Sequence, residues 1–254
     1  MKKTRAPFLR GLTVQLLAIT VLPLTLLLLL IAFGSVSLHE QDMRGLVGER
    51  DERAVQSAAA ALASELHHRA ASISNLVALV DLSNDISFIT ATDDLASDFD
   101  GGLAYLDKDG RLIATTNSPL ETSQSGLWDY VAQNNILLAS PADLQPVFSD
   151  LFPDPRSKRL FVIVSQFSSS QNIIVAGAFS PETLAFETLS ASYPDSTHVT
   201  IFLFDSSRQI LFSSGPLAVD NLSSDHPGAT EALRGESGTV YIKQNNVVYV
   251  KINK

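Results

Sequence analysis

The sequence predicts a mixed chain of helices and antiparallel sheets, in the α/β (α+β) class, joined to an N-terminal transmembrane helix. Three observations carry this prediction. Leu12–Phe33 is a long uncharged apolar run, and the residues after it keep helical spacing for many turns. Farther on, apolar runs rich in β-branched residues flank short turns, as the strands of hairpins do. This pattern recurs about 100 residues later, which predicts two tandem modules with an antiparallel sheet in each.

Composition limits the partners and the chemistry of the chain. It has 254 residues, 45% of them hydrophobic, so the part beyond the apolar run can bury a core. The formal net charge of −9 argues against a nucleic-acid partner, because phosphate binding needs clustered Lys and Arg. There is no Cys, which excludes disulfides, thiolate metal sites and Cys nucleophiles.

The apolar run at 12–34 is expected to be a transmembrane helix. A helix over Leu12–Phe33 reaches about 33 Å at 1.5 Å per residue, against about 30 Å for a hydrocarbon core. The tail at 1–11 carries only basic charges, whereas the first charges after the run are acidic. By the positive-inside rule, the tail is cytoplasmic and the body is extracytoplasmic. We therefore expect a single pass through the plasma membrane, with Leu12–Phe33 in the lipid bilayer.

A cleaved signal peptide is the alternative interpretation of this run. Its apolar region would be unusually long, and Ala32-Phe33-Gly34 is a poor A-x-A cleavage site. The sequence therefore favours an uncleaved anchor.

A single long helix is predicted over 35–82. Its first part, Glu40–Arg53, is dense in mixed charge, so we expect a solvated stalk. Apolar residues then keep helical spacing, which predicts an amphipathic half that docks on a domain. The apolar stripe also predicts a homodimer through Glu40–Leu82. His67 and His68 would point about 100° apart, so we expect solvated histidines and no metal site.

The first module is predicted at 83–190. The turn Asp107-Lys-Asp-Gly110 is a strong hairpin signal. Pro181 is favourable at the first position of a helix. The expected elements are strands at 102–106 and 111–116, a helix near 127–135, a loop at 141–159, strands at 160–167 and 173–179, and a helix at 182–189.

The second module is predicted at 191–254. Asp205 aligns with Asp107 at an offset of 98 residues. The expected elements are strands at 199–204 and 209–214, a short helix at 227–234, and a closing hairpin at 239–243 and 247–252. Because the chain ends two residues after the last strand, we expect a truncated module and a fragment of a longer protein.

Several stretches together resemble a known family. They are Leu106–Thr115, Trp128–Tyr130 with Phe148–Asp150, Leu160–Gln166, and His226–Gly238. Their order and spacing are similar to those of double Cache sensor domains, which are tandem PAS-like modules. Such domains form the extracytoplasmic heads of bacterial chemoreceptors, histidine kinases and diguanylate cyclases. The resemblance implies a receptor in which the first module binds a small molecule, and in which a second membrane span and an output domain follow.

By this resemblance, seven residues are expected near a ligand pocket of the first module. They are Tyr105, Trp128, Asp129, Tyr130, Phe148, Asp150 and Gln166. Aromatic side chains such as Trp128 and Tyr130 could form walls with polar tips, and each Asp could pair with a cationic group. The alternatives are that Trp128 is a core residue and that Asp129 and Asp150 belong to turns or caps.

The chain departs from the family at two positions. The amino-acid-binding subgroup has an Arg two residues before the Trp, where this chain has Gly126. It also has an Asp after the last strand of the first module, where the nearby residue is Ser180. Because a bidentate carboxylate clamp needs a guanidinium, we expect that the chain is not an amino-acid sensor of that type.

Other function classes find little support. The sequence has no G-x-S-x-G, H-E-x-x-H or P-loop motif, so we expect no enzymatic activity and no cofactor. Asp93, Asp94, Asp98 and Asp100 lack the spacing of a calcium loop and predict a solvated loop. The competing class is an anchored, exported adapter with a structural or interaction role and no small-molecule ligand.

Overall fold

The computed structural model describes residues 11–83, 97–116, 124–134, 136, 138–143, 145–190, 200–214, 222–223, 225–241 and 246–249. The chain divides into two compact units, Met1–Arg53 and Ala54–Lys254. Predictions for Asp93, Asp94 and the strand beyond residue 249 lie outside the described residues.

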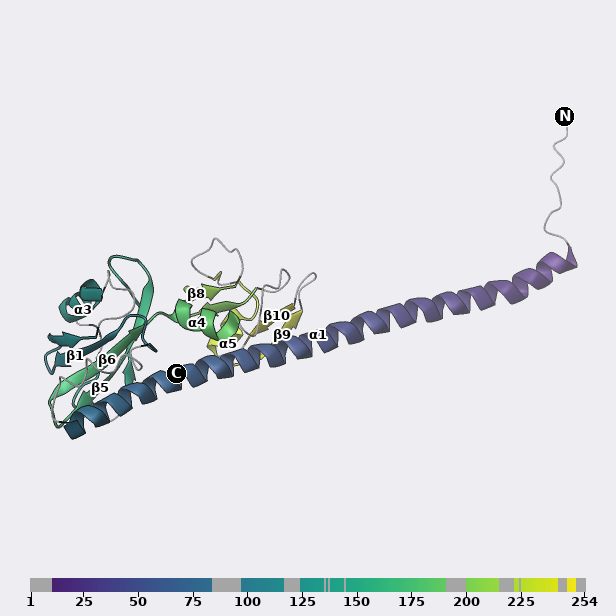
Figure 1. Ribbon diagram of the computed structural model, residues 1–254. Coiled ribbons are helices and arrows are strands. Elements are labelled where there is room, and N and C mark those ends of the chain that lie inside the picture. Colours follow the sequence, from purple (N-terminus) through teal and green to yellow (C-terminus); the bar gives the residue numbers. More distant parts are fainter. Residues whose placement is uncertain are drawn as a thin grey trace, which may run out of the picture. The chain divides into compact units, whose positions relative to one another are not determined.

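The described part of the first unit belongs to helix α1 (Leu12–Ser83), the long helix of Figure 1. Val14–Val36 is a stretch of 23 residues that is long and apolar enough to cross a membrane, and its apolar side chains are exposed. The helix continues through Pro23, as membrane helices tolerate. A signal sequence near an N-terminus can pass the same test of length and composition, so the membrane anchor stays a prediction.

The second unit is organised on an antiparallel sheet with the strand order β2-β1-β6-β5-β3, and β4 also pairs with β5. The strands are β1 (Leu103–Asp107), β2 (Leu112–Thr115), β3 (Val147–Phe148), β4 (Phe152–Pro153), β5 (Leu160–Ser168) and β6 (Ile173–Phe179). β3 and β4 lie inside the predicted loop 141–159. That prediction is wrong for these residues, since two-residue strands are too short to produce a periodic pattern.

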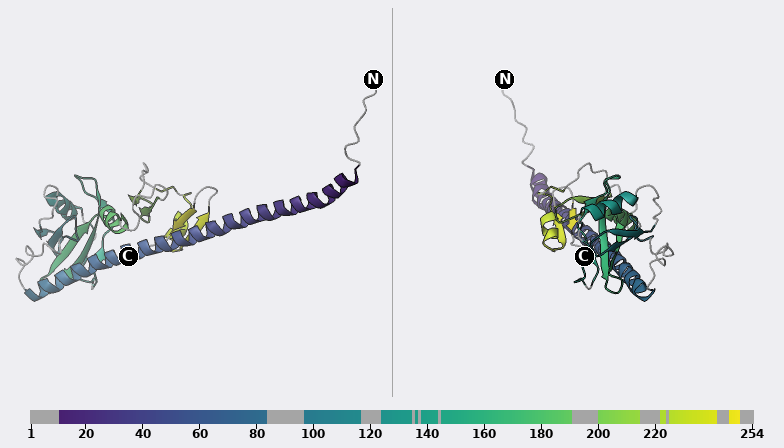
Figure 2. Two further views of the ribbon diagram at one scale, coloured as in Figure 1. Left: turned by 45° about the vertical axis from the view of Figure 1, so that its right-hand side comes forward. Right: turned by 90° about the vertical axis from the view of Figure 1, so that its left-hand side faces the viewer.

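Both faces of this sheet are covered by helices. Figure 1 shows α3 (Gln124–Gln133) on one side of the sheet and the C-terminal part of α1 on the other, and Figure 2 gives two further views. On the α1 face, Ile73, Leu76 and Val80 of α1 pack with alternate strand residues and with α4 (Pro181–Ser190). On the α3 face, Leu127, Trp128 and Val131 pack with the intervening strand residues. The C-terminal part of the long helix therefore packs on the sheet, as its amphipathic pattern predicts.

The remaining elements are two short hairpins and a helix. β7 (Phe202–Phe204) pairs with β8 (Ile210–Ser213), and β9 (Gly238–Tyr241) pairs with β10 (Asn246–Tyr249). The helix α5 (Ala229–Leu233) lies between the two hairpins in the chain. Leu203 and Phe212 pack against the α1-face core, and α4 contacts β8. The predicted elements are thus present, while the division into two modules stays a prediction.

Candidate functional site

Trp128 occupies the centre of the α3 face. Leu127, Trp128 and Val131 are adjacent on α3, so the helix turns its apolar side toward the sheet. The Trp128 side chain is 1% exposed, and its indole N–H donates to the carbonyl oxygen of Gly101 over 3.1 Å. A buried indole with its donor satisfied inside the protein fits the core-residue alternative.

A second aromatic contact lies beside Trp128. The rings of Tyr130 and Phe152 are stacked, with centroids 6.3 Å apart and an angle of 18° between planes. Tyr130 is half-buried, whereas Phe152 from β4 is buried against Phe161 of β5. The α3 face therefore has an aromatic rim that reaches solvent at Tyr130.

A guanidinium lies against the start of α3, where the sequence has no Arg. A Cβ atom at Gly126 would be 2.8 Å from Nε of Arg156 and 3.1 Å from its Cζ, so the Arg156 side chain fills the space above Gly126. The sequence does not point to Arg156, because this residue is 30 positions from Gly126 in a Pro-rich loop that carries no local signal. A guanidinium in this place can hold a carboxylate or another anion.

Asp154 fixes the loop that carries Arg156. Its carboxylate is 2% exposed and accepts the amides of Ser157 over 2.8 Å and Arg156 over 3.4 Å, as well as the Ser157 hydroxyl. Burial raises the pKa of Asp154, but the hydrogen bonds from Ser157 and Arg156 and the Arg156 charge outweigh it, so the pKa is lowered. The carboxylate therefore holds the loop in its ionised form.

Three of the predicted site residues lie on the opposite, α1 face. Tyr105 is fully buried there, and its hydroxyl has no hydrogen-bond partner in the described structure. Burial raises the pKa of Tyr105 to about 12. Gln166 accepts a hydrogen bond from the Ser74 hydroxyl of α1 over 2.8 Å, and Phe148 packs against the same core. The structure therefore does not bring these residues together with Trp128.

The two predicted aspartates are exposed. Asp129 lies on α3 and Asp150 follows β3. Of the seven predicted residues, the structure places only Trp128 and Tyr130 on the α3 face side by side with Phe152. Among the residues that the structure describes, no group of three or more His, Asp or Glu is arranged to hold a metal ion.

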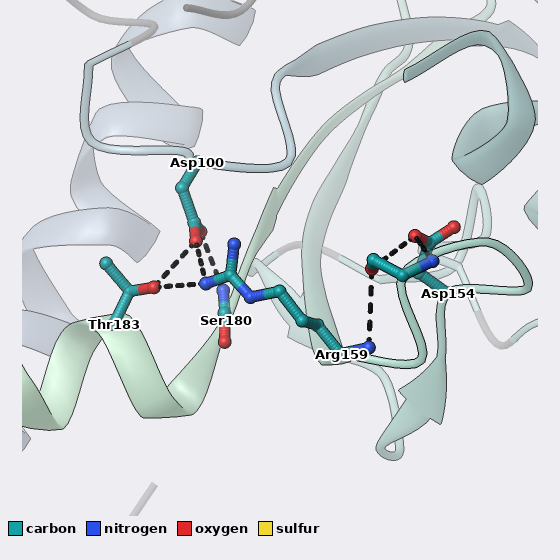
Figure 3. Close-up of polar contacts among 6 residues, drawn as sticks. Asp100, Asp154, Arg159, Ser180 and Thr183 are labelled. Carbon is teal, nitrogen blue, oxygen red and sulfur yellow. Dashed lines mark hydrogen bonds and ion pairs between the residues drawn. The ribbon is translucent and has the colours of Figure 1, made fainter. Parts of the chain in front are cut away.

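A polar network surrounds Ser180, at the start of α4 (Figure 3). The Asp100 carboxylate accepts the Ser180 amide over 2.7 Å, the Thr183 hydroxyl over 2.9 Å and Nη2 of Arg159 over 3.1 Å. Asp98 and Asp100 are thus part of the fold, which makes the predicted solvated loop wrong for these two residues. Asp100 supplies the carboxylate beside Ser180, where the sequence itself has none.

Comparisons with known proteins identify the fold. No family model matches the chain, and no curated protein matches it. The ligand-binding domain of the Pseudomonas fluorescens chemoreceptor CtaA, in complex with L-serine, aligns with a TM-score of 0.51 at 16% identity, over 82% of this chain and 87% of that one. The ligand-binding domain of the Campylobacter jejuni chemoreceptor Tlp3, in complex with L-valine, aligns with a TM-score of 0.51 at 10% identity, over 84% and 89%.

The alignments cover most of both chains, so the likeness extends beyond one hairpin or one sheet. The fold predicted by the resemblance is confirmed: the chain has the mixed helix and antiparallel-sheet fold of chemoreceptor ligand-binding domains.

Proposed function

We propose that the chain is the ligand-sensing, extracytoplasmic region of a membrane-anchored signal-transduction receptor. The observation that carries this proposal is the fold, which is shared with the ligand-binding domains of two bacterial chemoreceptors. The apolar stretch Val14–Val36 supports the anchor, and the basic tail before it supports a cytoplasmic N-terminus.

The ligand class we propose is a small molecule with a carboxylate or another anionic group, bound at the exposed edge of the α3 face. Arg156 supports this class, because its guanidinium lies against Gly126 at the start of α3, the helix that also carries Tyr130. The two related domains were solved with L-serine and L-valine, which both carry a carboxylate. The expectation against an amino-acid ligand rested on the lack of an Arg at Gly126 and of an Asp at Ser180, and the side chains of Arg156 and Asp100 lie beside these two positions.

Binding is tested on the full chain in lipid nanodiscs. Its melting temperature is measured against a panel of free amino acids, amine-free carboxylates and amines. We expect at least one carboxylate to raise the melting temperature, and Arg156→Gln to weaken its binding about tenfold or more. Arg111→Gln, an exposed Arg at the β1–β2 turn, is the matched control and keeps full affinity. If the panel leaves the melting temperature unchanged, the adapter class replaces the sensor proposal.

The membrane anchor is tested separately. The full chain is expressed in a bacterium, and its membranes are washed with alkaline carbonate and treated with protease from the outside. We expect the chain to stay in the membrane with an intact N-terminus, and the segment after Val36 to be cut. Release of a shortened chain into the soluble fraction would support a signal peptide instead.

Signal transmission is proposed to occur by a population shift. A ligand that prefers one state moves α1 against the sheet or against a dimer partner, and it can shift the balance only by its difference in affinity. α1 is held to the sheet by polar contacts such as Ser74–Gln166, which two alternative helix positions would make differently. Homodimerisation through Glu40–Leu82 predicts a dimer in sedimentation of the nanodisc-free chain in detergent, and a monomer at high concentration would contradict it.

A further inference from the structure

The segment 97–102 lies between the helices of the second unit and contacts three of them. We call residues 97–102, with the sequence SDFDGG, the connector. On one side, Asp98 contacts α1: its Oδ2 accepts the Ser72 hydroxyl over 3.3 Å and lies 3.2 Å from Nε2 of His68. Both contacts bridge residues far apart in the sequence, so they tie the connector to α1.

The connector is packed tightly against β6. Phe99 is fully buried, and a Cβ atom at Gly177 would lie 2.5 Å from its ring. The amide of Gly101 donates to the carbonyl of Ala178 over 2.9 Å, and a Cβ atom at Gly101 would lie 2.7 Å from Cβ of Ala178. Because no side chain fits at Gly101 or Gly177, the connector has little freedom to move independently of the residues that it contacts.

Asp100 ties the connector to the start of α4. Its carboxylate accepts hydrogen bonds from the Ser180 backbone amide, the Thr183 hydroxyl and the Arg159 guanidinium, and Figure 3 shows these three groups converging on it. A carboxylate at a helix N-terminus is favoured by the helix dipole, and the Arg159 bond is charge-assisted. α4 in turn contacts β8 of the next hairpin.

The next residue, Gly101, ties the connector to α3. Its carbonyl oxygen accepts the indole N–H of Trp128. Gly101 directly follows Asp100, whose carboxylate holds α4, in the chain. We propose that the connector 97–102 couples the position of Trp128 on the α3 face to α4 and α1. A displacement of the indole moves the Gly101 carbonyl, and with it the two aspartates that hold α4 and α1.

This coupling is a property of the fold and needs no ligand, although its use in sensing rests on the proposed function. The tests below therefore contain no ligand, so their failure is distinct from a failure of the sensor proposal. The chain offers suitable reporters, since Trp128 is its single Trp.

The first test measures amide hydrogen exchange of Trp128→Phe in the full chain in nanodiscs. This substitution keeps an aromatic ring and removes the indole donor. We expect exchange at 180–184 and 68–72 to rise about threefold or more. Val131→Ala is the control, because it loosens α3 without a bond to the connector. Unchanged exchange at 180–184, or an equal rise in Val131→Ala, would overturn the coupling.

The second test runs in the opposite direction and uses a milder change. Thr183→Val removes the hydroxyl that donates to Asp100 and accepts from Arg159, and acrylamide quenching of Trp128 fluorescence is measured. We expect the quenching constant to rise about twofold, since the indole acceptor is less firmly held. Thr188→Val is the matched control on the same helix, because its hydroxyl bonds only the Leu184 carbonyl in the described contacts. Equal quenching in Thr183→Val and the wild type would contradict the proposal.

Discussion

The first hairpin, β1–β2, and the second hairpin, β7–β8, are built on the same hydrogen bonds at an offset of 98 residues. In each, the amide of an Asp donates to the carbonyl four residues on, from Asp107 to Arg111 and from Asp205 to Gln209. Oδ1 of each Asp accepts the amides two and four residues later. The register also shifts at the same place in both hairpins. The turn chemistry is therefore repeated within the chain.

The surroundings of the two hairpins differ. β1 pairs with β6 as well as β2, and Leu106 is fully buried on the α3 face. In the described structure β7 pairs with β8 alone, and its counterpart residue Phe204 is only half-buried. The same local turn thus serves a central strand in one case and a two-stranded ribbon in the other. Turn formation is local, whereas the stability of each hairpin depends on what packs against it.

The largest expected difference comes from truncating the equivalent strand residues. Leu106→Ala should lower the free energy of unfolding by about 3 kcal/mol, because it leaves a cavity in a fully covered core. Phe204→Ala should cost about half as much, because part of the ring is already in water. Urea unfolding of the full chain in nanodiscs, followed by circular dichroism, measures both. Equal losses would mean that the two hairpins are equally embedded.

The next difference concerns Tyr105, which corresponds to Leu203 in the second hairpin. Its buried hydroxyl lacks a partner in the described structure, so Tyr105→Phe should raise the free energy of unfolding by about 1 kcal/mol. The pKa of Tyr105 is raised from 10.0 to about 12, so the folded state keeps its proton where the unfolded state loses it. The contribution of Tyr105 protonation to the free energy of unfolding is therefore fully present below pH 10 and is lost as the pH rises toward 12.

Alkaline unfolding curves of the wild type and Tyr105→Phe test this assignment. We expect the stability difference between the two proteins to widen between pH 10 and 12. Tyr130→Phe is the control, because Tyr130 is half-buried on the other face. A difference that stays constant over this range would mean that the Tyr105 hydroxyl ionises as readily in the folded protein as in the unfolded one, and is therefore not desolvated.

The elements of this fold could be predicted because their signals are local. The Asp107–Gly110 turn and the helix start at Pro181 depend on neighbouring residues, and both are present as expected. The face that each strand residue occupies could not be predicted, because the sheet is covered on both sides. All seven residues of β6 are buried, so no alternation of polar and apolar residues marks the two faces. The family resemblance groups Tyr105 and Gln166 with Trp128, and the residue pattern of the strands does not separate them.

The candidate site was only partly predictable for a related reason. Trp128 and Tyr130 follow from one short stretch of helix. The Arg156 guanidinium above Gly126 and the Asp100 carboxylate beside Ser180 are contacts between segments 30 and 80 residues apart. A single sequence contains no periodic or turn signal for such pairs, because they are decided by how the sheet, α3 and α4 pack.

A smaller difference lies at the fourth position of the turn, where Gly110 and Arg208 correspond. Both have positive φ, 78° for Gly110 and 67° for Arg208. Gly110→Arg should cost about 1 kcal/mol, because a side chain is strained there. Arg208→Gly should relieve that strain but lose the hydrogen bond from Nη2 to the Thr230 hydroxyl. Its gain in the free energy of unfolding should therefore be smaller than the loss in Gly110→Arg. Thermal unfolding of the two single variants tests this, and a stabilising Gly110→Arg would contradict it.

The smallest effect should come from the feature that the hairpins share. Asp107→Ala and Asp205→Ala each remove a carboxylate that accepts two turn amides at the protein surface. We expect each to cost about 0.5–1 kcal/mol, with the somewhat larger loss at Asp205, because its carboxylate also accepts the Ser207 hydroxyl and its bond to the Gln209 amide is part-buried. Asn in place of each Asp should recover most of the loss, since its side-chain oxygen accepts the same amides. A much larger loss for Asp107→Ala would mean that the β1–β2 turn also stabilises the sheet that contains β1. The repeat would then preserve the geometry of the hairpin but not its contribution to the free energy of unfolding.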